Sequence, residues 1–152
     1  MNARPAKPDD ADELVRLRAV MLRSLPAGSW DDDWVEPARA ALADRLAAGT
    51  MAAFVVDRPD SPGLASCALG VIEERLGSPG NPLGRGGYVF SVATDPDMRR
   101  RGFSRACMSA LLSWFRDRGV GRVDLRASAE GEPLYRSLGF ARTPDPAMRL
   151  RF

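Results

Sequence analysis

The sequence contains no histidine, and it has only two cysteines and a single lysine, Lys7, among its 152 residues. Without histidine, and without cysteines at metal-ligand spacing, it offers no zinc-binding pattern, so we expect no metal site. Proton transfer must then use Asp, Glu, Tyr, water or a chain terminus. Cys67 and Cys107 lie in separate core-like segments, which predicts reduced packing residues and no disulfide framework.

Long apolar runs are also missing. No stretch approaches the roughly 20 apolar residues of a membrane span. Residues 1–15 have no apolar core typical of a secretory signal, so we expect a cytoplasmic protein that does not bind membranes. The net charge of +2 gives no reason to expect nucleic-acid binding. Length and a hydrophobic content of 45% fit one globular domain over residues 1–152.

Two helices are predicted before residue 50. The first covers residues 10–24, and the second ends at Gly49. Both begin with a capping-box pattern, in which an acidic N-cap is followed three residues later by glutamate. These boxes are Asp10 with Glu13 and Asp33 with Glu36.

The rest of the chain alternates strands and helices. A glycine- and proline-rich loop over residues 77–87 interrupts the pattern. The resulting order, ααβββαβαββ, predicts an α/β domain with a mixed sheet and helices on its faces. The expected strands are 51–56, 64–74, 88–94 and 122–127, one starting at Phe140, and one containing Met148, Leu150 and Phe152; the expected helices are 103–118 and 133–139.

The most informative segment is Arg99–Ser104, between a predicted strand and a predicted helix. A helix start presents unpaired N–H groups and the positive end of the helix dipole, which suits phosphate or pyrophosphate. Gly102 would let the backbone approach such a ligand closely, and three consecutive arginines add charge. A solvated basic turn is the alternative interpretation of these arginines.

Two further segments occur in the right order around this loop. Val92-Ala93-Thr94-Asp95-Pro96 precedes it, and Leu125–Ser128 followed by Pro133-Leu134-Tyr135-Arg136-Ser137-Leu138-Gly139-Phe140 comes after it. Together with the R-x-x-G-x-small spacing from Arg99, the three segments resemble the GNAT superfamily of N-acetyltransferases. The resemblance implies a mixed, mostly antiparallel sheet with a splayed central pair of parallel strands and helices on both faces.

The resemblance also implies an activity: direct transfer of acetyl from acetyl-CoA to a primary amine, with coenzyme A as product. A non-catalytic acyl-CoA-binding sensor of the same fold is the alternative. Tyr135 would be the general acid for the departing thiolate; otherwise it is a packed aromatic residue. Ser128 could face pantetheine, cap a helix, or do both. The cofactor-binding residues implied are Val92, Ala93, Thr94, Arg99, Arg100, Arg101, Gly102, Phe103, Ser104, Arg105 and Ser128.

Two positions depart from the family pattern. Ser104 replaces the usual second glycine or alanine, although its hydroxyl is small enough to fit. Tyr88 stands where histone-acetylating members carry a glutamate base, and tyrosine, with a pKa of about 10, is a poor base near neutrality. Glu73 or Glu74 is the nearest candidate base, and only one of them can face the cleft because neighbouring strand residues alternate. An exposed hairpin charge, or a water chain without a dedicated base, is equally compatible.

The acceptor is not identified by any motif, and both small-molecule and protein or peptide amines stay open. Three carboxylates between two indoles, in Trp30-Asp31-Asp32-Asp33-Trp34, favour a small cationic amine. The alternative is that these acids only support a helix start. The predicted acceptor-binding residues are Trp30, Asp31, Asp32, Trp34 and Tyr88. The alternating C-terminal residues could pair across a homodimer.

Overall fold

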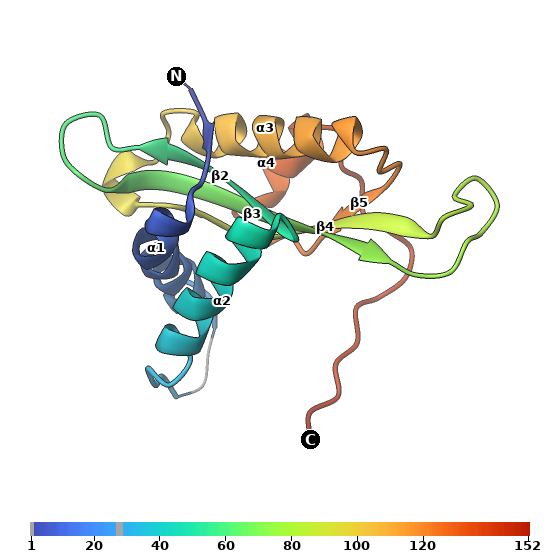
Figure 1. Cartoon of the computed structure of the whole chain (residues 1–152), viewed down its shortest axis with the longest axis horizontal. Helices are drawn as coiled ribbons and strands as arrows, with labels where there is room; N and C mark the ends of the chain where they lie inside the picture. Colours follow the sequence, from blue (N-terminus) through green and yellow to red (C-terminus); the bar gives the residue numbers. More distant parts are fainter. Residues whose placement is uncertain (1, 27–28) are drawn as a thin grey trace.

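A five-stranded sheet organises the protein, whose computed structural model describes residues 2–26 and 29–152 (Figure 1). The strands are β1 (Arg4–Pro5), β2 (Met51–Asp57), β3 (Leu64–Glu74), β4 (Arg85–Thr94) and β5 (Val123–Leu125). The helices are α1 (Ala11–Arg23), α2 (Val35–Ala48), α3 (Phe103–Asp117) and α4 (Glu132–Ser137), with short 3-10 turns at Pro8–Asp10 and Pro96–Met98. None of the helices in these two ranges is long and apolar enough to cross a membrane.

The strands follow one another in the order β1-β2-β3-β4-β5. The first four pair antiparallel, and β4 pairs parallel with β5. The predicted mixed, mostly antiparallel sheet is therefore confirmed. The parallel pair lies at one edge of the described sheet, because β5 is its last strand.

Helices cover both faces of this sheet, with α1 and α2 on one face and α3 and α4 on the other (Figure 1). The α3 helix packs very closely, since a Cβ added at Gly87 of β4 would lie 2.7 Å from the Phe115 ring. Cys67 and Cys107 are free and fully buried on opposite sides of the sheet, as the sequence predicts. Each serves as a packing residue in one of the two cores.

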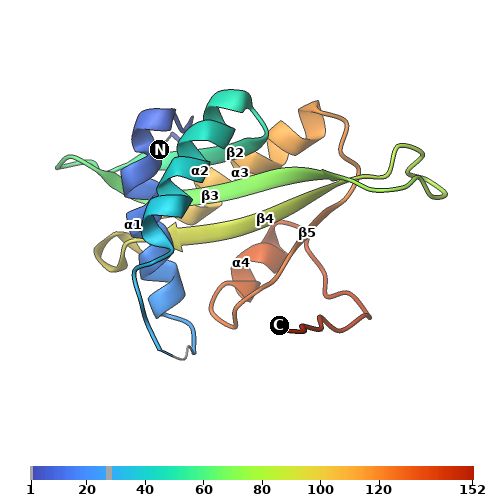
Figure 2. The ribbon, with the colours of Figure 1, turned by 60° about the horizontal axis from the view of Figure 1, so that its bottom comes forward.

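The parallel strands separate after a short contact (Figure 2). Their pairing runs only from Gly87–Val123 to Val89–Leu125, whereas β4 continues to Thr94. Beyond Val89, where β4 pairs with β3 alone, the register of β4 against β3 shifts, and Ser91 adopts a φ of 49°. A left-handed serine inside a strand marks a β-bulge, which bends the strand and redirects its side chains. The splayed pair implied by the family resemblance is thus present.

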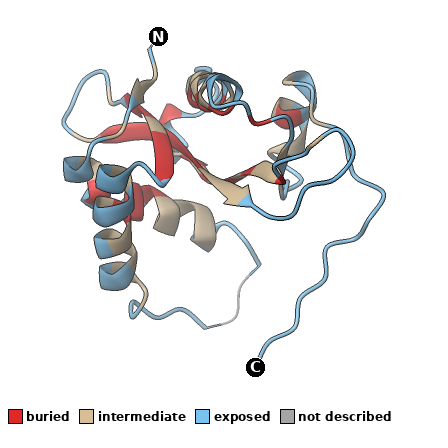
Figure 3. Ribbon diagram, turned by 45° about the vertical axis from the view of Figure 1, so that its right-hand side comes forward, coloured by how far each residue is buried: buried red, intermediate tan, exposed pale blue. Residues whose placement is uncertain are grey.

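The predicted strands after Phe140 are wrong. Residues 140–152 form no strand, and the tail is exposed in Figure 3. The exposed fractions of Met148, Leu150 and Phe152 are 87%, 77% and 115%. Alternation alone does not make a strand, because a strand needs a partner to complete its hydrogen bonds, and the described chain supplies none here. Pairing of this tail across a homodimer stays a prediction.

The predicted capping boxes are also not formed. Asp10 precedes α1, but its side chain binds the Arg4 guanidinium and accepts the Lys7 N–H at 2.8 Å. Trp34, and not Asp33, occupies the N-cap of α2. The local pattern predicts helix capping by these side chains, but other contacts in the loops and the tertiary structure prevent it. The 77–87 loop is shorter than predicted, because β4 already begins at Arg85.

Candidate active site

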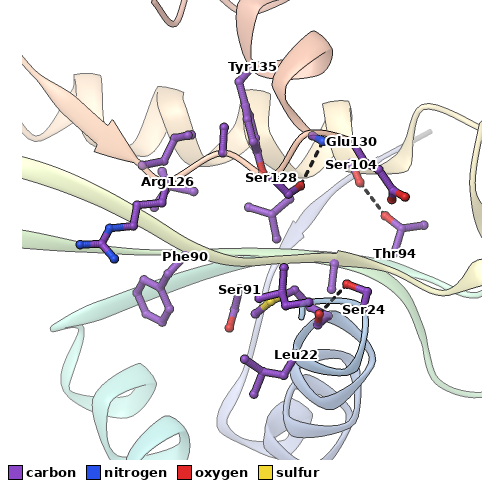
Figure 4. Close-up of a pocket in the computed structure, with 18 of the residues that line it drawn as sticks. Leu22, Ser24, Phe90, Ser91, Thr94, Ser104, Arg126, Ser128, Glu130 and Tyr135 are labelled. Atoms are coloured by element: carbon purple, nitrogen blue, oxygen red, sulfur yellow. Dashed lines mark hydrogen bonds between the residues drawn. The ribbon is translucent and has the colours of Figure 1, made fainter. Parts of the chain in front are cut away.

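A cleft of about 610 Å³ opens where β4 and β5 separate. The C-terminal half of α1 forms one wall, residues 88–94 of β4 form the floor, and residues 125–135 form the other wall (Figure 4). Thr94, Ser104 and Glu130 lie at one end of the view, and Phe90 and Arg126 lie at the other. We call these the cofactor end and the acceptor end, after the roles that the sequence resemblance implies for their residues. Of the predicted acceptor residues, Tyr88 lines this cleft.

At the cofactor end, hydroxyl groups connect β4 to the start of α3. Thr94 Oγ1 lies 2.5 Å from Ser104 Oγ and 2.8 Å from Ser66 Oγ. Ser66 in turn donates to the Ala93 carbonyl at 3.0 Å. The serine that departs from the family pattern is therefore part of a hydroxyl chain that fixes the strand end against the helix.

The loop before α3 has the backbone expected of an anion site. Arg100 and Gly102 both have left-handed φ values, 63° and 80°, and such turns direct consecutive N–H groups into a concavity. The first helical hydrogen bond runs from the Ala106 N–H to the Gly102 carbonyl. The N–H groups of the preceding first turn, at Phe103, Ser104 and Arg105, thus have no partner within the helix.

The arginine side chains of this loop divide into two groups. Arg99 lines the cleft, whereas Arg100 and Arg101 are exposed beside it. Arg105 donates to Ser137 Oγ at 2.7 Å and so joins α3 to α4. A phosphate role for the Arg100 and Arg101 side chains stays a prediction.

Tyr135 stands in the wall opposite α1 and is 8% exposed (Figure 4). Its ring lies edge-on to Phe140, with centroids 6.0 Å apart, and an added Cβ on Gly131 would come within 2.9 Å of it. Burial raises the pKa of the Tyr135 phenol, which keeps it protonated near neutrality. Ser128, beside it, accepts the Gly131 N–H at 3.1 Å, so it supports the turn into α4 while also lining the cleft.

The candidate bases do not lie in the cleft. Glu73 and Glu74 are on the hairpin end of β3, opposite Gly86 and Arg85, and neither lines the cavity. Glu73 is bound to Arg75 at 2.7 Å. The carboxylate that does line the cleft is Glu130, which sequence reasoning missed because nothing in its loop marks it; it lies at the cofactor end (Figure 4).

The acidic segment between α1 and α2 also lies outside the cleft lining. Trp30 and Trp34 pack edge to face with centroids 5.8 Å apart, and Trp30 Nε1 donates to Asp32 at 3.1 Å. Asp31 accepts the Asp33 N–H at 2.9 Å. These contacts all lie within the segment, and its role in acceptor binding stays a prediction.

Arg18 and Ser91 are cleft residues that sequence reasoning also missed. Arg18 lies on α1, and its guanidinium donates to the Ser91 hydroxyl at the β4 bulge. The signal available in the sequence was helical spacing, because Arg18 precedes Met21, Leu22 and Leu25 of the same cleft-facing stripe by three, four and seven residues.

A family model describing the acetyltransferase (GNAT) family matches residues 19–140. The chain belongs to the GNAT family. The match spans most of the sequence and includes all three segments that carry the resemblance.

Solved structures agree with this membership. A predicted acetyltransferase from Clostridium acetobutylicum, solved with acetyl-CoA, has a TM-score of 0.84 at 22% identity over 99% of this chain and 95% of that one. A GCN5-related N-acetyltransferase from Ralstonia eutropha JMP134 has a TM-score of 0.80 at 27% identity, covering 98% and 97%. These likenesses support the GNAT fold over the whole described chain.

Curated relatives match over a shorter stretch. The [ribosomal protein bS18]-alanine N-acetyltransferase of Escherichia coli K12 is 42% identical over 55 residues. That stretch covers 34% of this chain and only 37% of the relative's length. It therefore gives no direct information on the acceptor of the present protein.

Proposed function

We propose that this GNAT protein transfers the acetyl group of acetyl-CoA directly to a primary amine, with Tyr135 as general acid. The observation that carries the proposal is the position of Tyr135: a buried, protonated phenol in the cleft wall opposite the end of β4 that has separated from β5. The loop before α3, whose backbone would bind the pyrophosphate, follows the end of the same strand.

Acetyl-CoA, whose thioester supplies the activated acetyl group, would occupy this cleft. The N–H groups of residues 100–104 would hold its pyrophosphate, helped by the helix dipole and Arg99. The N–H groups of Val92 and Thr94 would hold the pantetheine and the acetyl oxygen, since β4 has no parallel partner beyond Val89. A donor at the acetyl oxygen stabilises the negative charge that develops there during attack.

Direct transfer is favoured over a covalent acyl-enzyme because neither thiol lines the cleft. Burial raises the pKa of Cys107 to about 11 and that of Cys67 further, so neither is a thiolate near neutrality. The amine nitrogen would attack the thioester carbonyl itself. The Tyr135 phenol would then give its proton to the sulfur as the carbon–sulfur bond breaks.

The attacking amine must be neutral. No carboxylate lines the acceptor end within the part of the chain that the structure describes, which favours removal of the amine proton by water over a dedicated base. Glu73 and Glu74 would then act only as hairpin charges. The E. coli relative acetylates a protein alanine, so both protein and small-molecule amines belong in the test.

The proposal is tested by incubating the protein with isotopically labelled acetyl-CoA and a panel of amines and peptides. Free coenzyme A and N-acetylated products are measured by mass spectrometry. We expect equal amounts of coenzyme A and labelled product with at least one acceptor, and no label on the protein. Tight acetyl-CoA binding without turnover on a broad panel would instead indicate the non-catalytic sensor.

A further inference from the structure

Arg18 is a half-buried cation that lines the cleft beside Ser91 and has no carboxylate partner among the described residues. Its guanidinium donates to the neutral hydroxyl of Ser91, and it forms no ion pair with any residue that the structure describes. Other arginines differ: Arg16, two residues earlier, is bound to both Glu13 and Asp95. An arginine carries five N–H donors, so Arg18 keeps donors free.

The surroundings of Arg18 would strengthen its attraction for an anion. Met21 and Leu22 of α1 and Leu25 just after the helix line the same wall, and Phe90 lies on the floor. Burial lowers the pKa of the Arg18 guanidinium, although an arginine stays charged at any physiological pH. A partly desolvated charge interacts more strongly than an exposed one, because less water screens it.

The cleft as a whole is positive. The charged residues that line it are Arg18, Arg99, Arg126 and Arg149 against Glu130. Glu130 lies at the cofactor end, and Arg126 lies with Phe90 at the other end (Figure 4). The acceptor end therefore carries Arg126 and no described acid, and the cleft has more arginines than acids, which disfavours a polycationic acceptor.

The position of Arg18 also limits how far an anion can lie from the reacting amine. Ser91, which Arg18 contacts, directly precedes Val92, the residue proposed to hold the acetyl oxygen. Adjacent Cα atoms are about 3.8 Å apart, so an anion held beside Ser91 would lie close to an acetyl group held at Val92. Ser91 is 5% exposed and left-handed, a costly conformation for a non-glycine residue that aims its hydroxyl at Arg18.

We infer that Arg18 is the specificity residue for an acceptor that carries an anionic group, a carboxylate or phosphate, within a few atoms of its amine. Free amino acids have this chemistry, whereas polyamines and protein N-termini do not. The inference rests on the proposed acetyltransferase function and narrows its substrate class. A purely structural bond that fastens α1 to the β4 bulge is the competing explanation for Arg18.

The test compares matched acceptors that differ only in the anion. Free amino acids are paired with their amides, and O-phosphoethanolamine is paired with ethanolamine, which separates carboxylate from phosphate. Spermidine and an alanine-terminated peptide complete the panel. We expect higher kcat/KM for the anionic member of a pair, even though the amide's less basic amine is more often neutral and so favoured chemically.

Arg18→Met should reduce that preference by about 10- to 100-fold, as expected for a lost hydrogen bond between charged groups, mainly through KM. Arg18→Lys should restore part of it. Acetyl-CoA affinity should not change in either variant. Arg23→Met is the matched control, because Arg23 is an exposed arginine of the same helix that stacks on Trp30 outside the cleft. The control should keep the wild-type preference.

Product binding gives a second measurement that does not need turnover. With coenzyme A bound, N-acetylalanine should raise the melting temperature of the wild type more than N-acetylalaninamide, and Arg18→Met should remove the difference. A preference for amides, peptides or spermidine, or a preference unchanged in Arg18→Met, overturns the inference while leaving acetyl transfer intact. Coenzyme A binding with no anion-dependent shift also overturns it. Failure of the proposed function is different: no coenzyme A binding and no transfer to any amine.

Discussion

Replacing Tyr135 with phenylalanine removes the proposed general acid and almost nothing else. The ring keeps its edge-on contact with Phe140 and its fit against Gly131, and the Tyr135 hydroxyl has no side-chain hydrogen-bond partner within the described ranges. We therefore expect the free energy of unfolding to change by less than about 1 kcal/mol. Acetyl-CoA affinity should also be unchanged.

The chemical step should slow markedly in Tyr135→Phe. A positioned general acid contributes about 10²- to 10⁴-fold, and we expect the lower end because a thiolate leaves readily. Single-turnover measurement of coenzyme A release isolates this step from product release, which could hide the effect in kcat. Gly131→Ala is an informative companion, since its Cβ would push the Tyr135 ring aside while the hydroxyl group is kept. Wild-type single-turnover rates in Tyr135→Phe would remove Tyr135 from the mechanism.

Three further predictions follow from the same geometry. Gly102→Glu should abolish acetyl-CoA binding in calorimetry. Gly102→Ala imposes the same strain on the left-handed backbone but adds no carboxylate, so it should retain measurable binding. Normal binding by both variants would refute the role of the loop. Asp95→Ala should lower the free energy of unfolding, measured in urea, by about 3 kcal/mol, because Asp95 is 5% exposed and bound by Arg16 and Arg58. The loss should not be larger, because each arginine keeps a second acid, and a loss below about 1 kcal/mol would contradict the prediction. The rate should rise with pH as the acceptor amine deprotonates and show no fall below about pH 10, because burial raises the pKa of Tyr135 and its acid form persists; a descending limb near neutrality would point to a different acid.

Local sequence patterns predicted the interior elements well. The apolar periodicity of α3 and the apolar runs of β2 and β3 coincide with buried faces of the fold. The end of α2 and the loop before α3 were also predictable, because glycine readily adopts the left-handed φ values found there, 74° at Gly49 and 80° at Gly102. Such features depend on neighbours in the chain.

Features that depend on distant partners were not predictable. The alternation of Met148, Leu150 and Phe152 implied a strand, yet its formation requires an edge to pair with. The bulge at Ser91 arises from the register between β3 and β4, and no residue type at this position predicts it. Arg18 looks like an ordinary exposed helix residue until that bulge places a hydroxyl beside it.

The central claim concerns where acetyl-CoA binds and which residues meet its thioester. A crystal structure of the complex tests it most directly. The account predicts the pyrophosphate on the backbone of residues 100–104, the acetyl oxygen at the Val92 N–H, and the sulfur within hydrogen-bonding distance of the Tyr135 hydroxyl. A thioester bound away from the separation of β4 and β5, or a sulfur that faces away from Tyr135, would contradict it.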